Sequence, residues 1–156
     1  MKIREADLSD VGEMVRLSEQ YRATLPNYSP VLWRKSRNSA DKQAAFFRAL
    51  VPLEETLAFV VESGSSIAGF IVARLQAPPP VYDPGGPVCL VDDFCVSSDS
   101  EWERVGAALL GAVESRSKER GAVLSVVVCP QRAHSKRGFL ARGGFQVASE
   151  WHVRAL

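Results

Sequence analysis

Two consecutive carboxylates interrupt an apolar run in the middle of the chain. The segment VCLVDDFCV, residues 88–96, has the composition of a β-strand, and Asp92 and Asp93 lie inside it. Neighbouring residues of a strand point to opposite faces unless a bulge intervenes, so one acid must enter the packed side or line a cleft. Such an acid can bind an amine or remove its proton, while a structural ion pair with an arginine explains it equally well.

A polar loop follows this strand and leads into a helix rich in small residues, CVSSDSEWERVGAALLGAVE, residues 95–114. The first amides of such a helix can hold a phosphate, because their N–H groups are free and the helix dipole favours an anion. Ser100 and Glu103 also have the spacing of a capping box, which would occupy those amides. Asp99, Glu101 and Glu103 stabilise a helix start but repel a phosphate. The loop taken alone therefore favours a capped helix.

The overall composition excludes several classes of function. The chain has 156 residues, 46% of them hydrophobic, with 19 Lys and Arg against 18 Asp and Glu. This length predicts one domain over residues 1–156, and the balanced charge predicts no nucleic-acid or membrane partner. No apolar run approaches the roughly 18 residues that span a bilayer, and the first residues lack a signal-peptide core. The expected location is cytoplasmic.

Cysteine and histidine are too sparse and too scattered to suggest a metal site. Cys89, Cys95 and Cys129 have no metal-ligand spacing and lie in apolar runs, so they are expected to be buried free thiols. His134 and His152 are isolated from each other and from other ligand types. We therefore expect no bound metal.

Hydrophobic periodicity predicts the elements that must position these residues. The hairpin at 56–77 turns at SGSS, and the apolar run AVLSVVVCP, residues 122–130, is typical of a strand buried on both faces. A helix between two strands implies a parallel crossover. The expected order is β, α, α, β, β, β, α, β, α, β, which predicts an α/β (mixed α+β) fold with helices on both faces of the sheet. Its elements are a strand at 2–5, helical regions at 9–22 and 29–50, the hairpin, a strand at 88–96, a helix after residue 100, a strand at 122–130, a helix at 131–144 and a last strand at 145–156.

That order, with VDDFCVSSDSEWERVGAALL and RGFLARGGF, resembles the GCN5-related N-acetyltransferase (GNAT) family over essentially the whole chain. In that family a strand ending in Val leads into Arg/Gln-x-x-Gly-x-Gly/Ala, whose amides hold the pyrophosphate of acetyl-CoA. Val96 and Gly106 fit this pattern, whereas Glu101 replaces Arg or Gln and Arg104 replaces the first glycine. The guanidinium of Arg104 can pair with phosphate oxygens instead. The resemblance assigns acetyl-CoA to Phe94, Cys95, Val96, Glu101, Trp102, Arg104, Val105, Gly106 and Ala107.

The resemblance also implies a fold and an activity. It implies a mostly antiparallel sheet of about six strands, with one parallel pair splayed at the cofactor. The implied reaction moves an acetyl group from acetyl-CoA directly to a primary amine of a small molecule or peptide. Asp92 and Asp93, singled out by their position in an apolar strand, are the candidate catalytic residues. Dimers are frequent among relatives, which leaves a homodimer open. The alternative is a non-catalytic acyl-CoA-binding or protein-interaction domain with the same fold.

The end of the chain carries the second part of the resemblance. Gly144 and Phe145 match the family's closing turn, but Leu140 stands where the family commonly has the tyrosine that protonates the leaving thiolate. A basic cluster on the same predicted helix is expected to be a solvated face; contact with a CoA phosphate is the functional alternative. Its members are Arg132, Lys136, Arg137 and Arg142. Trp33, Phe46 and Phe47 are expected to be core or to line the acceptor groove.

Overall fold

A five-stranded mixed sheet forms the centre of the computed structural model, which describes residues 1–156. The strands lie in chain order, with the first four antiparallel and the last parallel to the fourth. They are β1 (Lys2–Glu5), β2 (Thr56–Ser63), β3 (Ser66–Gln76), β4 (Val88–Val96) and β5 (Leu124–Val127). The helices are α1 (Val11–Arg22), α2 (Ser39–Leu50), α3 (Ala107–Glu119) and α4 (His134–Arg142). Short helical turns are η1 (Leu8–Asp10), η2 (Leu25–Asn27), η3 (Asp99–Glu101) and the π-helical η4 (Trp102–Gly106).

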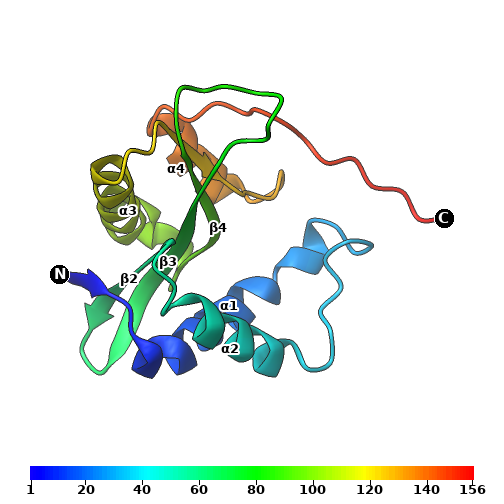
Figure 1. Cartoon of the computed structure of the whole chain (residues 1–156). Coiled ribbons are helices and arrows are strands. Elements are labelled where there is room, and N and C mark those ends of the chain that lie inside the picture. Colours follow the sequence, from blue (N-terminus) through cyan, green and yellow to red (C-terminus); the bar gives the residue numbers. More distant parts are fainter.

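Helices cover both faces of the sheet, as predicted (Figure 1). Helices α1 and α2 pack on one face, where Phe47 meets Phe70 edge to face at a centroid distance of 5.5 Å. Helices α3 and α4 pack on the other face, where Phe94, Trp102 and Leu109 are buried together. The predicted mixed α+β fold class is confirmed, and so is the parallel crossover from β4 to β5 through α3.

A β-bulge in β4 changes which face its side chains occupy. Val72 of β3 pairs with Asp93 and Ala73 pairs with Val91, so Asp92 is the extra residue. Because the bulge shifts the two-residue alternation, Val91 and Phe94 both pack on the α3 side, although they are three residues apart. Cys95 packs on the opposite side, against α1 and α2.

The predicted last strand is not formed. Residues 145–156 have no strand pairing, and the chain extends away from the sheet after α4 (Figure 1). A strand is stable only when a neighbour completes its ladder, and alternation in the sequence does not supply that neighbour. For the same reason the prediction of a doubly buried fifth strand is wrong. β5 is the edge of the sheet, and none of its residues is buried.

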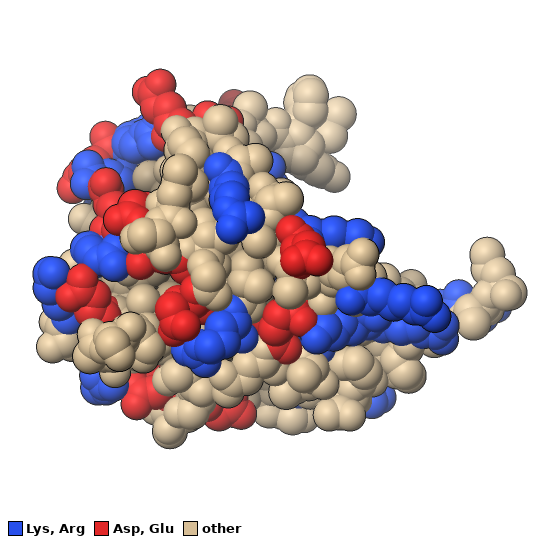
Figure 2. Space-filling model, turned by 90° about the horizontal axis from the view of Figure 1, so that it is seen from below, with Lys and Arg blue, Asp and Glu red and all other residues tan.

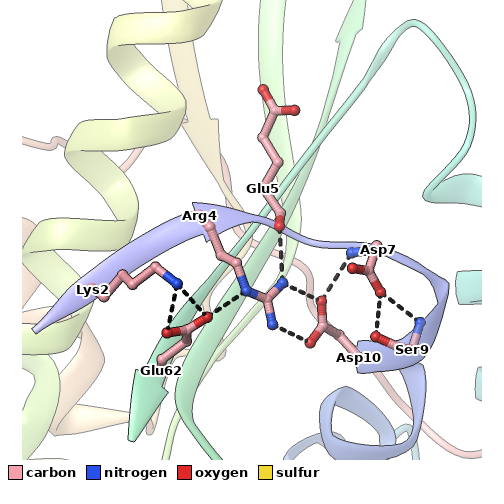
Figure 3. A network of polar contacts seen from close by, with 7 residues as sticks. All are labelled: Lys2, Arg4, Glu5, Asp7, Ser9, Asp10 and Glu62. Atoms are coloured by element: carbon pink, nitrogen blue, oxygen red, sulfur yellow. Dashed lines mark hydrogen bonds and ion pairs between the residues drawn. The ribbon is translucent and has the colours of Figure 1, made fainter.

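A polar network ties β1, β2 and the start of α1 together (Figure 3). The guanidinium of Arg4 donates to both oxygens of Asp10, at 2.7 and 2.8 Å, and its Nε donates to Glu62 at 2.7 Å. Asp10 also accepts from the amide of Asp7 at 2.9 Å, and the side chain of Asp7 accepts from the amide of Ser9 at 2.7 Å. Asp10 is only 6% exposed, so its charge depends on these donors.

Replacing Asp10 with Ala is expected to lower the free energy of unfolding by about 3 kcal/mol, because it removes both Asp10 contacts of Arg4 and leaves Glu62 as its one remaining acidic partner. The hydrogen bond from Arg4 holds the pKa of Asp10 below its ordinary value of 3.8. This contribution is therefore present above the ordinary pKa and disappears as the pH falls through the lower folded value. Denaturant titrations at neutral and acidic pH measure both effects. Glu13→Ala, which breaks an exposed pair with Arg16, is the control and should change stability by no more than about 0.5 kcal/mol.

Candidate functional site

Strands β4 and β5 separate partway along their length. They pair from Val88 with Leu124 to Val91 with Val127, and the last backbone bond joins Val128 N–H to the carbonyl of Val91 at 3.0 Å. Beyond that point β4 continues to Val96 with only β3 beside it. Its other edge therefore offers backbone polar groups that no strand satisfies, and such groups need another partner.

A cavity of about 560 Å³ opens beside this free edge. It lies between the α1–α2 layer, the loop that joins those helices, β4 and the segment after β5. Its lining residues include Tyr21, Arg22, Leu32, Trp33, Lys35, Gln43, Phe46, Asp92, Phe94, Val128, Pro130 and Lys136. Trp33 and Phe46 line this cavity, and Phe47 belongs to the core, as one of the two predicted alternatives has it. That the cavity receives the acceptor stays a prediction.

The two predicted acids have different surroundings. Asp92 lines the cavity, is exposed, and accepts a hydrogen bond from Arg74 at 3.0 Å. Asp93 is half-buried and receives only a long contact of 3.5 Å from the side chain of Gln43. Burial raises the pKa of Asp93, because desolvation penalises its charged form. The bulge thus leaves one acid in an ion pair and the other with a raised proton affinity.

Tyr21 is a polar residue of this cavity that the sequence did not single out. Its hydroxyl is buried and has no hydrogen-bond partner. Burial raises the pKa of Tyr21, so it remains a neutral phenol. An orphan hydroxyl beside a cavity is available to bind a polar atom of a ligand.

The capping box predicted at the phosphate loop is not formed. The hydroxyl of Ser100 contacts the hydroxyl of Ser98 at 2.9 Å, and the carboxylate of Glu103 bonds to Arg142 on α4. Glu101 is also paired, with Arg104 at 2.6 Å. These two carboxylates therefore repel an anion less than the sequence suggested.

The predicted cofactor residues in this loop divide into buried and exposed groups. Trp102, Val105 and Gly106 are buried, whereas Arg104 and Ala107 are exposed. Trp102 stacks on Phe139 of α4 at a centroid distance of 5.6 Å. A Cβ on Gly106 would lie 2.9 Å from the Trp102 ring, so packing explains this glycine without a ligand. Among the strand residues, Phe94 and Cys95 are buried and Val96 is partly exposed.

Lys136 contradicts the prediction of a solvated basic face. It is 3% exposed, and its Nζ donates to the carbonyls of Phe94 at 3.3 Å and Val128 at 3.1 Å. Burial lowers the pKa of Lys136. Its burial could have been predicted from its spacing to Phe139 and Leu140, three and four residues later, because those positions lie on the same helix face. Arg132 and Arg142 are exposed, as predicted.

The surface carries side chains of both charge signs, and no cluster of metal-binding side chains is present. Lys and Arg are interspersed with Asp and Glu over most of the face in Figure 2. No group of three or more His, Cys, Asp or Glu side chains is arranged to hold a metal ion. All three cysteines are free; Cys89 and Cys95 are buried, and Cys129 is partly exposed. The structure contains no helix long and apolar enough to span a bilayer.

Solved structures share this architecture at low sequence identity. The BH1408 protein from Bacillus halodurans, in a mutant form, has a TM-score of 0.86 and 19% identity, with 100% of this chain and 99% of that chain covered. A predicted acetyltransferase with acetyl-CoA from Clostridium acetobutylicum has a TM-score of 0.76 and 16% identity, covering 99% and 95%. A ribosomal-protein-alanine N-acetyltransferase from Brucella melitensis biovar Abortus has a TM-score of 0.69 and 17% identity, covering 100% of both chains.

Sequence comparison extends this likeness from fold to family. No curated protein sequence matches the chain significantly. Residues 17–145 match the model of the acetyltransferase (GNAT) family. The matched region runs from α1 to the turn after α4 and includes the separated strands, the cavity and the loop before α3. The chain therefore belongs to the GNAT family of acetyltransferases.

Proposed function

We propose that residues 1–156 form a single-domain N-acetyltransferase that moves the acetyl group of acetyl-CoA directly to a primary amine. The observation that carries this proposal is the unpaired edge of β4, which adjoins a cavity lined by the ion-paired Asp92 and by Gln43. The side chain of Gln43 in turn contacts the desolvated Asp93 at 3.5 Å. The proposed location is cytoplasmic, and the proposed acceptor is a small molecule or a peptide. The proposed reaction involves neither a nucleic acid nor a membrane as partner.

The donor is proposed to lie along the free edge of β4. The main-chain N–H groups of Phe94, Cys95 and Val96 would bind the pantetheine arm and polarise the thioester carbonyl, since the carbonyl of Phe94 already accepts from Lys136. The pyrophosphate would lie at the turn before α3, with the exposed Arg104 close by. Because Arg104 already pairs with Glu101, binding the phosphate would exchange one charge-assisted contact for another.

The acceptor is proposed to occupy the cavity between the α1–α2 layer and β4. Trp33 and Phe46 supply apolar lining, and Asp92 supplies a carboxylate that can bind an ammonium group. Attack on a thioester requires a neutral amine, since an ammonium has no lone pair. Asp93 is proposed to accept the amine's proton, directly or through water. Its raised pKa makes it a stronger base than an ordinary aspartate.

Leu140 favours a second candidate function. It is buried on α4 at the position where the family resemblance expects a tyrosine acid. A domain that lacks that acid could retain acyl-CoA binding without turnover. The second candidate is therefore a non-catalytic acyl-CoA-binding or interaction domain with the same fold.

Thermal stabilisation by CoA and acetyl-CoA, followed by an acetylation assay on a broad amine panel, tests the proposal. A ligand at 100 times its dissociation constant should raise stability by about 2.7 kcal/mol. Stabilisation together with release of free CoA thiol in the presence of an amine supports the transferase. Stabilisation without transfer to any amine supports the non-catalytic domain. No stabilisation at millimolar ligand contradicts both.

A further inference from the structure

The side chain of Lys136 occupies the gap where β4 and β5 separate. Its Nζ links the two sides of that gap through the carbonyls of Phe94 on β4 and Val128 after β5. The Nζ also lies 5.2 Å from the ring centroid of Phe94 and 5.6 Å from that of Trp102. Lys136 lines the cavity as well, so its amine is buried yet adjoins the proposed reaction space.

Lys136 lies one helical turn before Leu140 on the same buried face of α4. Leu140 is apolar and cannot give a proton. The lysine side chain is long enough to bring an ionisable group from this helix face into the strand gap, as its two carbonyl contacts show. The helix therefore presents an acid to the gap from a position different from the one the family resemblance predicts.

The hydrogen bonds of Lys136 are compatible with the release of one proton. An ammonium has three N–H donors, and two of them are taken by Phe94 and Val128. After loss of the third proton, the neutral amine still has two N–H groups for the same two carbonyls. Both protonation states thus keep the contacts that hold the side chain in the gap.

We infer that Lys136 is the general acid that protonates the departing CoA thiolate, and this inference rests on the proposed function. The neutral nitrogen of the acceptor forms a bond to the thioester carbonyl carbon. The carbon–sulfur bond then breaks with its electron pair on sulfur, and Lys136 transfers one proton to that sulfur. The acceptor nitrogen loses one proton to Asp93 or water, and Lys136 recovers a proton from solvent. The products are an N-acetylated amine and CoA thiol.

Several titratable groups face Lys136 from the elements packed around it. Asp93 and Cys95 lie on β4, Cys129 follows β5, and the ring of Tyr21 on α1 is 6.0 Å from Nζ. Desolvation outweighs the attraction of the acidic groups and lowers the pKa of Lys136 from its ordinary 10.5. Because the protonated form is the acid, kcat should fall as the pH rises through this lowered value.

The decisive experiment compares the pH dependence of kcat in four proteins. They are the wild type, Lys136→Met, Tyr21→Phe and Lys118→Met, the last being an exposed lysine on α3. Lys136→Met should lower kcat by about 10²-fold, leave KM within about threefold, and remove the fall of kcat at high pH. Tyr21→Phe and Lys118→Met should keep that fall. Lys136→Gln is the second variant, in case the Met variant does not fold.

The other outcomes overturn the inference. It fails if Lys136→Met retains kcat within about threefold, if only KM changes, or if Tyr21→Phe is the variant that loses the high-pH fall. If neither Lys136 variant folds, the pH dependence of kcat in the wild type is the remaining test. A general acid with a lowered pKa requires kcat to fall at high pH, so a wild type without that fall contradicts the inference. A wild type that binds acetyl-CoA but acetylates no amine refutes the proposed function itself, which distinguishes that failure from failure of the role of Lys136.

Discussion

Asp93→Asn is expected to lower the kcat of the proposed acetyl transfer by about 10²-fold or more without destabilising the protein. The carboxylate is half-buried and has one long contact, with Gln43, so burial raises the pKa of Asp93 above its ordinary value of 3.8. The native state then binds the proton more tightly than the unfolded state, and stability falls as the pH rises through the folded pKa. The uncharged side chain of the Asn variant avoids the free-energy cost of burying a charged carboxylate. The variant should therefore keep or gain free energy of unfolding at neutral pH while losing activity.

Asp92→Asn is the matched control for this prediction. Asp92 is exposed and paired with Arg74, so removing its charge should affect acceptor binding and KM more than kcat. In the wild type, kcat should fall as the pH drops through the raised pKa of Asp93, and Asp93→Asn should lack that limb. Retention of both kcat and the acidic limb by Asp93→Asn would show that Asp93 is only a structural acid.

Trp102→Ala is expected to lower the free energy of unfolding by about 3–5 kcal/mol. Trp102 is 4% exposed and packs between two aromatic rings, edge-on to Phe94 at 4.9 Å and stacked on Phe139 at 5.6 Å. It also begins the π-helical turn that leads into α3, with Gly106 closely packed against its ring. Its loss should therefore weaken both the core and the loop proposed to bind the pyrophosphate.

Trp151→Ala provides a control with the same chemical change at a residue that is 81% exposed. Its stability should remain within about 0.5 kcal/mol of the wild type. Denaturant unfolding measures both variants, and the thermal shift with acetyl-CoA shows whether the loop still binds the ligand. Equal effects of the two substitutions would mean that the packing of Trp102 contributes little. An unchanged ligand shift in Trp102→Ala would place the pyrophosphate elsewhere.

Most of the fold could be predicted from local patterns in the chain. The strand at 88–96 has the predicted bounds, and the hairpin at 56–77 turns at Gly64, whose φ of +60° suits glycine. The helices also fall within their predicted regions, although α2 begins only at Ser39. These features can be predicted because hydrophobic periodicity and turn-forming residues are properties of a few neighbouring residues.

The site depended on contacts between distant segments. The bulge at Asp92 arises from pairing with β3, and it is this bulge that distinguishes the surroundings of Asp92 from those of Asp93. The sequence predicts that Lys136 belongs to a solvated basic cluster, yet the carbonyls of Phe94 and Val128 hold it in the strand gap.

The incorrect predictions have the same physical origin. Ser100 and Glu103 have the spacing of a capping box, but Arg142, 39 residues further along the chain, takes the carboxylate of Glu103. Residues 145–156 alternate like a strand, but no neighbour pairs with them. Residue type and spacing were sufficient for the family and for the order of elements as far as α4, and they singled out Asp92 and Asp93 as candidate acids. Burial, pairing and proton affinity were decided only by the tertiary structure, because each depends on which distant groups replace water around a side chain.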